Sequence, residues 1–446
     1  IPLHHLWITD PMASNLLYKS SPEERIIFYS LAGTYGVYIL GGMYVLGSVL
    51  GWLLLMVFLL KIFIRSSADG AGHPLLRISP LVWLWVIGMV AMLLALLIAH
   101  IDRRLGTGMT IKSTIGWAKG WALLALFPLL GNLLKVNPAI VARGCCIAAF
   151  SAVPFAIVGI VFYAVGLSGE LYMSPLKAIG GPLEAFNVRL FGLNPETHLA
   201  RWQFIAPWAP AAGLMSCFYL LICLQEQDRA WRFMGVLGAT VMCLLCQSRA
   251  GWVIFIAIIP MVFGLSRLRN PRVWLATGVL IPALLLLAQP LYDWLLDSYT
   301  QVKQSRPGST RVRETLARIA VQRWANEAPI WGHGIVERGP KSVEHMPIGS
   351  HHSWYGLLYV KGAVGFLALA LPLALTSFAM LILAQYSKVA QASLGICIVI
   401  ISYSLFENLE ILVYLYWPAL LWLGISLSPE AYSTAWVGKP RHPKET

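Results

Sequence analysis

Charge is scarce in this sequence. Only 12% of the residues are charged, whereas 58% are apolar and the mean hydropathy is +0.69. This composition excludes an ordinary soluble globular chain, in which about a quarter of the residues are charged. Uncharged apolar stretches of roughly 17 to 25 residues, long enough to cross a bilayer as helices, recur along the chain. The sequence therefore predicts an all-α polytopic membrane protein.

Patterns of several other protein classes are absent. The net charge of +13 comes from Lys and Arg residues scattered between apolar stretches, which argues against nucleic-acid binding. All seven cysteines lie in apolar segments, including the pair Cys243 and Cys246 in VMCLLCQ. We expect free buried thiols, and neither a disulfide framework nor a zinc site. Because the chain lacks an initial Met and shows no cleavable signal pattern, we expect its start to be trimmed.

Signatures of common enzymes are missing too. The sequence contains no GxxxxGK loop, no HExxH and no GxSxG, which excludes nucleotide hydrolysis and the commoner hydrolases. It also has no DxD pair that would hold a metal-bound nucleotide sugar, since Asp293 and Asp297 stand four residues apart on an apolar turn. A reaction at a lipid-linked anion that needs neither metal nor cofactor is favoured.

About twelve helical spans are predicted from the apolar stretches. They cover residues 26–42, 43–64, 80–100, 116–134, 143–167, 204–224, 231–247, 250–266, 273–290, 354–384, 391–407 and 410–428. Only Gly41 and Gly42 separate the first two, and a count of eleven would invert the orientation downstream. Lys and Arg in the short connections place both termini in the cytoplasm, although Arg103, Arg104 and Lys112 depart from this pattern.

In this orientation the polar residues gather on the outer side. Residues 168–203, interrupted by Pro and Gly, are expected to form a re-entrant or interfacial segment. Residues 291–353 form a large external loop, and loops of this length are usually functional. Within this loop, Ser309 and Thr310 are expected to cap a helix over residues 311–327, which Pro329 ends.

The densest polar run enters an apolar helix directly after this loop. It begins with His351 and His352, and after nine intervening residues come Gly362 and then Gly365. A histidine at such a boundary can be neutral near pH 7 and accept a proton, or it can belong to the interfacial belt with its aromatic neighbours. The two glycines allow another backbone or a lipid chain to approach closely.

Arginines are the second polar feature. Arg249 stands between two spans, where its charge is unfavourable unless it binds an anion or reaches headgroup phosphates. Arg189, Arg311 and Arg313 lie on the same predicted side, and guanidinium groups suit bidentate contact with phosphate oxygens. Together the four arginines indicate a diphosphate site.

Four further charged residues have less specific expected roles. Arg318 and Arg323 are expected to be solvated charges of the external helix. Glu407 and Glu410 stand one turn apart at an outward boundary. They are expected to pair with outward arginines, and a catalytic role is the alternative.

The run from His351 to Gly365 resembles the bacterial O-antigen ligases, within the O-antigen ligase and polymerase superfamily. The mark of this family is a His followed by Asn, Ser or Gln, nine further residues and GxxG. The spacing here matches throughout, and the departure is His352 in the second place, which leaves open which histidine acts, although spacing favours His351.

Other segments are similar to the family in the same order along the chain. Residues 247–251 are similar to its SRxG-type turn, and residues 311–334 to its arginine-headed external helix with a PxxGxG step. Counting back from Pro329 slightly favours Arg313 over Arg311 as the family arginine. Arg189 is a weaker match.

The resemblance implies a GT-C-like membrane glycosyltransferase. Its expected reaction transfers O-antigen glycan from undecaprenyl diphosphate to the lipid A-core oligosaccharide, with inversion and without a metal. The reaction would take place in the periplasmic leaflet of the bacterial inner membrane, so the partners are these two glycolipids and membrane lipids. One of the two histidines would act as the base, and the arginines at positions 189, 249, 311 and 313 would bind the diphosphate.

The sequence leaves two other functions open. An O-antigen polymerase shares the superfamily and the lipid-linked substrate, and the sequence separates it poorly from a ligase. A transporter or flippase would use the outward arginines as an anion pathway. Such a protein should show an internal repeat and interrupted helices near the middle of the membrane, and the sequence shows no repeat.

Overall fold

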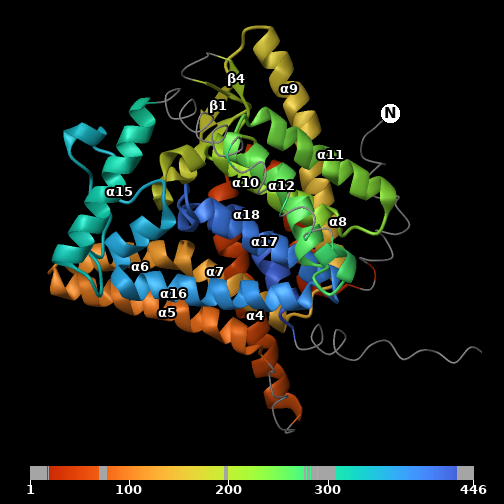
Figure 1. Cartoon of the computed structure of the whole chain (residues 1–446), viewed down its shortest axis with the longest axis horizontal. Coiled ribbons are helices and arrows are strands. Elements are labelled where there is room, and N and C mark those ends of the chain that lie inside the picture. Colours follow the sequence, from red (N-terminus) through yellow and green to blue (C-terminus); the bar gives the residue numbers. More distant parts are fainter. Residues whose placement is uncertain are drawn as a thin grey trace, which may run out of the picture.

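The computed structural model describes residues 18, 20–69, 78–194, 199–275, 278, 282, 289 and 307–428. Helices dominate this part of the chain (Figure 1). They are α2 (Pro22–Ala32), α3 (Thr34–Ile39), α4 (Met43–Asp69), α5 (Pro80–Asp102), α6 (Thr107–Lys119), α7 (Trp121–Leu133), α8 (Pro138–Phe150), α9 (Ala152–Ala164), α10 (Ala209–Cys223), α11 (Arg229–Leu245), α12 (Arg249–Leu265), α15 (Pro307–Glu327), α16 (Ser353–Leu383), α17 (Lys388–Ser404) and α18 (Leu409–Ser426).

Six helical segments of the described chain are long and apolar enough to cross a membrane. They are Met43–Ile64, Pro80–Asp102, Thr107–Leu133, Pro138–Ala164, Ser353–Leu383 and Leu409–Ser426, and the apolar helices α10, α12 and α17 are shorter. The chain is therefore a mostly helical, polytopic membrane protein. The total of about twelve spans remains a prediction. Most of the expected span 273–290, the first part of the external loop with Asp293 and Asp297, and the basic C-terminal tail lie outside the described residues.

The N-terminal region differs from its prediction. The expected span 26–42 consists of two short helices, α2 and α3, which are separated at Gly33. A capping box between Ser21 and Glu24 fixes the start of α2. The predicted turn before α4 is confirmed at Gly41, whose φ of +72° suits a residue without a side chain.

Residues 168–203 contain short strands, which lie between the membrane helices of this mostly helical protein. Strand β1 (Glu170–Met173) pairs antiparallel with β2 (Asn187–Arg189), and β3 (Gly192–Leu193) pairs with β4 (Ala200–Arg201). Two 3-10 turns, η2 (Pro175–Ile179) and η3 (Leu183–Phe186), lie between β1 and β2. The prolines disfavour a continuous helix here because proline has no backbone N–H to donate. The strand pairs provide hydrogen bonds for the backbone groups instead.

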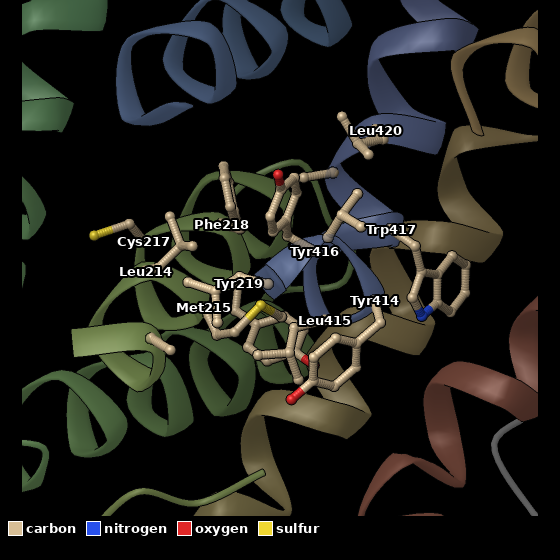
Figure 2. Packing of buried hydrophobic residues seen from close by; sticks show 14 of the residues in the cluster. Leu214, Met215, Cys217, Phe218, Tyr219, Tyr414, Leu415, Tyr416, Trp417 and Leu420 are labelled. Carbon is tan, nitrogen blue, oxygen red and sulfur yellow. The ribbon is translucent and has the colours of Figure 1, made fainter. Parts of the chain in front are cut away.

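A large apolar contact between α10 and α18 occupies the interior. Figure 2 shows Phe218 of α10 beside Tyr416 of α18. The rings of Phe218 and Tyr416 lie 5.5 Å apart between centroids. Helix α18 is kinked at Tyr416, two residues before Pro418, and the Tyr416 hydroxyl donates a hydrogen bond to the Leu409 carbonyl at 3.1 Å. This contact holds the start of α18, where Glu407 and Glu410 lie, against the core.

Helices from distant parts of the sequence pack side by side. Helix α5 runs along α16, and α7 runs along α18 (Figure 1). The second pair approaches closely because Gly131 and Gly424 face the opposite helix, where an added methyl group would overlap its backbone. The N-terminal and C-terminal parts of the chain therefore build one bundle.

Helix α16 is interrupted at Gly362, which has φ +65° and ψ −163°. Residues 329–334 enter the interruption: the His333 N–H donates to the Tyr359 carbonyl at 2.8 Å, and the Ala363 N–H donates to the Pro329 carbonyl at 2.9 Å. These bonds replace helical bonds that the interruption breaks. The close backbone approach predicted for the GxxG is confirmed. At Gly362 the chain's own loop fills this space, whereas an added methyl group on Gly365 would meet the Lys361 side chain of the same helix.

Alanine at Gly362 is expected to destabilise the protein strongly. Its methyl group would overlap the Ile330 carbonyl, and its backbone would keep a positive φ. We expect a loss of at least about 2 kcal/mol in the free energy of unfolding, seen as a lower Tm in detergent. Gly264→Ala is the matched control, because an added methyl group there meets nothing within 4 Å. Equal melting temperatures for the two variants would contradict the docking of the loop at this glycine.

Candidate active site

The two neighbouring histidines at the start of α16 have different surroundings. His352 is the N-cap of α16: its ring Nδ1 accepts a long hydrogen bond of 3.5 Å from the Tyr355 N–H, and its ring stacks on Tyr355 at 4.0 Å. His351 is half-buried and has a positive φ of 64°. Within the described part of the chain, no hydrogen bond engages its ring. The side chain of His352 therefore caps the start of α16, whereas the ring of His351 takes no part in this cap.

The turn between α17 and α18 holds this histidine pair. The Asn408 side-chain oxygen accepts a hydrogen bond from the His352 N–H at 3.1 Å. The Ser353 hydroxyl donates to the Glu407 carbonyl at 2.6 Å and accepts from the Leu409 N–H at 3.0 Å. Residues about fifty positions apart in sequence are thus locked together, so the backbone beside His351 has little freedom to move.

Glu407 is buried within reach of the same turn. Glu407 is 4% exposed, and its Oε2 accepts a hydrogen bond from the Trp208 ring N–H at 3.0 Å. Burial raises the pKa of this carboxyl to about 7, and the charge of Arg313 and the Trp208 bond offset part of that rise. Glu407 therefore accepts a hydrogen bond from Trp208 in place of the expected ion pair with an arginine. An acid with this pKa can hold or release a proton near neutral pH.

Helix α15 brings Arg313 to this region. The helix ends at Glu327 as predicted, but it begins at Pro307, so Ser309 and Thr310 lie inside it and do not cap it. Burial, and then the positive charge of Arg313, lower the pKa of His351 to about 4. His351 is therefore neutral at neutral pH and able to accept a proton. Figure 1 shows α15 at one end of the pair formed by α5 and α16.

Arg313 and Arg311 are distinguished by these effects. The charge of Arg313 acts on both His351 and Glu407, whereas the shifts of those two groups include no contribution from Arg311. Both arginines are exposed on α15. The choice of Arg313 over Arg311 as the family arginine remains a prediction.

A charge network attaches the end of α15 to α16. Arg323 forms ion pairs with Glu327 at 2.9 Å and with Glu337 at 2.7 Å, so the expectation of a solvated charge is wrong. The buried His333 ring bonds to Glu327 at 2.9 Å and stacks on Tyr359 at 4.2 Å. Hydrogen bonds from Arg323 and then His333 lower the pKa of Glu327 to about 2. The network fixes the loop that enters the interruption of α16.

Arg249 is the first residue of α12 and is exposed. Ser248 caps this helix, and added methyl groups on Gly213 and Gly251 would each lie close to Ser248, which shows that the starts of α10 and α12 meet. Because Trp208 caps α10 and bonds to Glu407, Arg249 stands at the same end of the bundle as Glu407.

Arg189 lies on β2 and is half-buried. Its backbone N–H donates to the Tyr38 hydroxyl at 3.1 Å, and that hydroxyl donates to its carbonyl at 2.9 Å. An added methyl group on Gly192 would lie 3.7 Å from its guanidinium, and Gly192 pairs with Arg201. Arg201 in turn donates to the Gln247 carbonyl at 3.1 Å, beside the start of α12. The strands thus connect the segments that carry Arg189 and Arg249.

A cavity of about 590 Å³ opens beside the histidine pair. Its lining includes Ser350 and Asn408 and also two charged residues, Lys361 and Glu410. Glu410 therefore faces a lysine and not one of the expected arginines. The sequence did contain a signal for Lys361, because a lone charge in an apolar span is usually functional. Nothing in the sequence indicated a role for Trp208 or Asn408, because only the fold brings them to this site.

Comparison with known proteins yields one family. Residues 234–370 match the family model described as O-Antigen ligase. The matched segment contains Arg249, Arg311, Arg313 and both histidines of the pair, whereas Arg189 and Glu407 lie outside it. No curated protein matches the chain. The match confirms the family resemblance that the order and spacing of the motifs indicated.

Proposed function

We propose that this membrane protein, whose residues 234–370 match the O-Antigen ligase family model, is an O-antigen ligase. Its donor would be O-antigen glycan on undecaprenyl diphosphate, and its acceptor a sugar hydroxyl of the lipid A-core oligosaccharide. The superfamily itself indicates a glycosyl-transferring enzyme that uses lipid-linked glycans in a membrane. One observation carries the assignment of the site: a neutral His351 lies where the charge of Arg313 acts on it and on the buried Glu407.

The proposed chemistry is a displacement at the anomeric carbon of the donor. The acceptor hydroxyl attacks this carbon, its proton passes to the His351 ring, and the bond from the carbon to the diphosphate oxygen breaks. The electron pair leaves with the diphosphate. Attack from the opposite face inverts the anomeric configuration. His351 suits the role of base because its lowered pKa keeps the ring unprotonated before the reaction.

Arginines would stabilise the leaving diphosphate in place of a metal ion. The guanidinium group of Arg313 carries a permanent positive charge and can hold phosphate oxygens through paired hydrogen bonds. Arg249 would add a second guanidinium at the same end of the bundle. Arg311 and Arg189 would contribute at the edge of the donor site. Positive charge that is already in place as the leaving group develops its charge lowers the barrier.

The distribution of Lys and Arg supports an orientation with both termini in the cytoplasm. The site at the start of α16 would then face the periplasm, in the inner membrane of a bacterium and with a GT-C-like arrangement of spans. The lipid-linked donor and the glycolipid acceptor would both reach it from the periplasmic leaflet.

Complementation tests the assignment. In a strain that lacks its O-antigen ligase, expression of this chain is expected to restore ladders of glycan linked to lipid A. A change only in chain length of the lipid-linked glycan would instead indicate a polymerase. A change in the leaflet that holds the lipid intermediate would indicate a flippase. The purified protein should then transfer the donor glycan to defined acceptors in EDTA, and turnover that depends on added metal would contradict the role of the arginines.

A further inference from the structure

The cavity beside the histidine pair contains a buried lysine that the proposed chemistry does not use. Lys361 is 4% exposed and lies inside the apolar helix α16, directly before the interruption at Gly362. A lysine at this depth of a membrane protein is unfavourable and is retained where it binds something or pairs with another charge. Glu410 lines the same cavity and carries the opposite charge, which acts on Lys361.

This pair does not form a closed ion pair. Within the described part of the chain, Lys361 makes no ion pair within 4.0 Å and no hydrogen bond through its ammonium group. The Glu410 Oε2 is buried and lacks a hydrogen-bond partner. Buried polar groups are nearly always hydrogen-bonded, and both residues line one cavity, so we expect a polar ligand or water to complete them.

The loop that fills the helix interruption builds a wall of this cavity. Gly332 lies so close to the backbone of Lys361 and Gly362 that an added methyl group would overlap it. Gly334 lines the cavity. His100 of α5 contacts the Gly334 carbonyl at 3.2 Å and the Thr110 hydroxyl at 3.1 Å, which ties the wall to α6. The lysine is therefore held by rigid elements, as a binding group requires.

The remaining lining is suited to a charged sugar. Helix α6 contributes Lys112, Trp117 and Lys119 to the lining, and α7 contributes Trp121. The Lys119 ammonium also donates to the Ile179 and Gly180 carbonyls at 3.3 and 2.9 Å. Lys112, one of the basic residues that depart from the predicted orientation, thus lines this cavity. Aromatic rings pack on the apolar faces of sugars, a carboxylate accepts from sugar hydroxyls, and lysines bind phosphate or carboxylate groups.

We propose that this cavity is the subsite for a phosphate-bearing or carboxylate-bearing sugar of the acceptor, with Lys361 binding the anion and Glu410 accepting from a hydroxyl. This inference rests on the proposed ligase function. The acceptor is favoured over the donor because the cavity reaches Ser350, next to His351, whereas the arginine proposed for the diphosphate lies on α15 outside its lining. An acceptor sugar held there would present a neighbouring hydroxyl to His351.

Binding of acceptor to the purified full chain tests this subsite without requiring turnover. The probes are a phosphorylated lipid A-core glycolipid and the same glycolipid after phosphatase treatment. Wild-type protein is expected to bind the phosphorylated form about tenfold more tightly, the effect of one charge-assisted hydrogen bond. Lys361→Gln should bind both forms equally and weakly. Glu410→Gln should keep the preference for phosphate, because it retains the lysine.

The control variant is Lys177→Gln, which removes an exposed lysine outside the cavity and should bind like wild type. The subsite is wrong if Lys361→Gln is monodisperse and keeps the tenfold preference. If instead the affinity for lipid-linked diphosphate donor falls in Lys361→Gln while acceptor binding is unchanged, the cavity belongs to the donor and the proposal is overturned. Failure of the ligase assignment would appear separately, as wild-type protein that binds acceptor but transfers no glycan to it.

Discussion

Replacing His351 by alanine is expected to reduce kcat/KM for glycan transfer by about 10²- to 10⁴-fold, the usual contribution of a general base. The lowered pKa of this histidine leaves its ring free to take a proton, and no hydrogen bond within the described residues occupies that ring. The protein should still insert into the membrane and bind both substrates, because the His351 side chain does not cap a helix. Transfer by the purified protein, with separate binding measurements, checks both parts.

The neighbouring histidine supplies the matched control. His352→Asn keeps a side-chain acceptor for the N-cap of α16 and places in this chain a residue found at that position of the family motif. We expect this variant to retain most of its activity. If His351→Ala remained active while His352→Asn were inactive, the base would be His352. If both variants were active, a group other than these two histidines would have to accept the acceptor proton.

Replacing Arg313 by alanine is expected to raise the KM for the lipid-linked donor by about 10- to 100-fold, the effect of losing one or two charge-assisted hydrogen bonds to phosphate. A second effect separates this role from a merely structural one. Without the positive charge of Arg313, the pKa of His351 should rise toward its ordinary value, and the pKa of Glu407 should also rise. The pH dependence of kcat/KM should therefore move to higher pH in this variant.

Arg318→Ala is the control for this prediction, because Arg318 is exposed on the same helix and acts on neither group. It should leave both the donor KM and the pH dependence unchanged. Arg313→Lys should keep the pH dependence but recover only part of the donor affinity, since a lysine provides the charge without the paired donors. An unchanged donor KM in Arg313→Ala would remove Arg313 from the diphosphate site.

The sequence predicted the parts of this protein that depend on local patterns. Hydropathy indicated the six long apolar helices, and glycine and proline indicated the turn at Gly41 and the end of α15 at Glu327. The spacing from His351 to Gly365 was enough to indicate the family. These predictions succeeded because helix periodicity, turn residues and motif spacing are properties of neighbouring residues.

Other features arise from contacts between distant residues, which a single sequence does not show. The bond from Trp208 to Glu407 joins residues about two hundred positions apart, and the loop around Gly332 fills an interruption that hydropathy reads as one continuous helix. Short strands in residues 168–203 likewise lack enough periodicity to predict. Arg323 looked solvated because its two acidic partners come together only in the fold.

The pH dependence of kcat/KM for the wild-type protein tests the central claim, that His351 takes the acceptor proton, most directly. This quantity reports ionisations of the free enzyme. Because the pKa of His351 lies at about 4, transfer should stay level as the pH falls from about 8 to about 5 and decline only below that range. A decline centred near pH 7 would follow the titration of Glu407, whose pKa lies at about 7. If that decline persisted in the residual activity of His351→Ala, it would assign the base to the carboxylate and contradict the account.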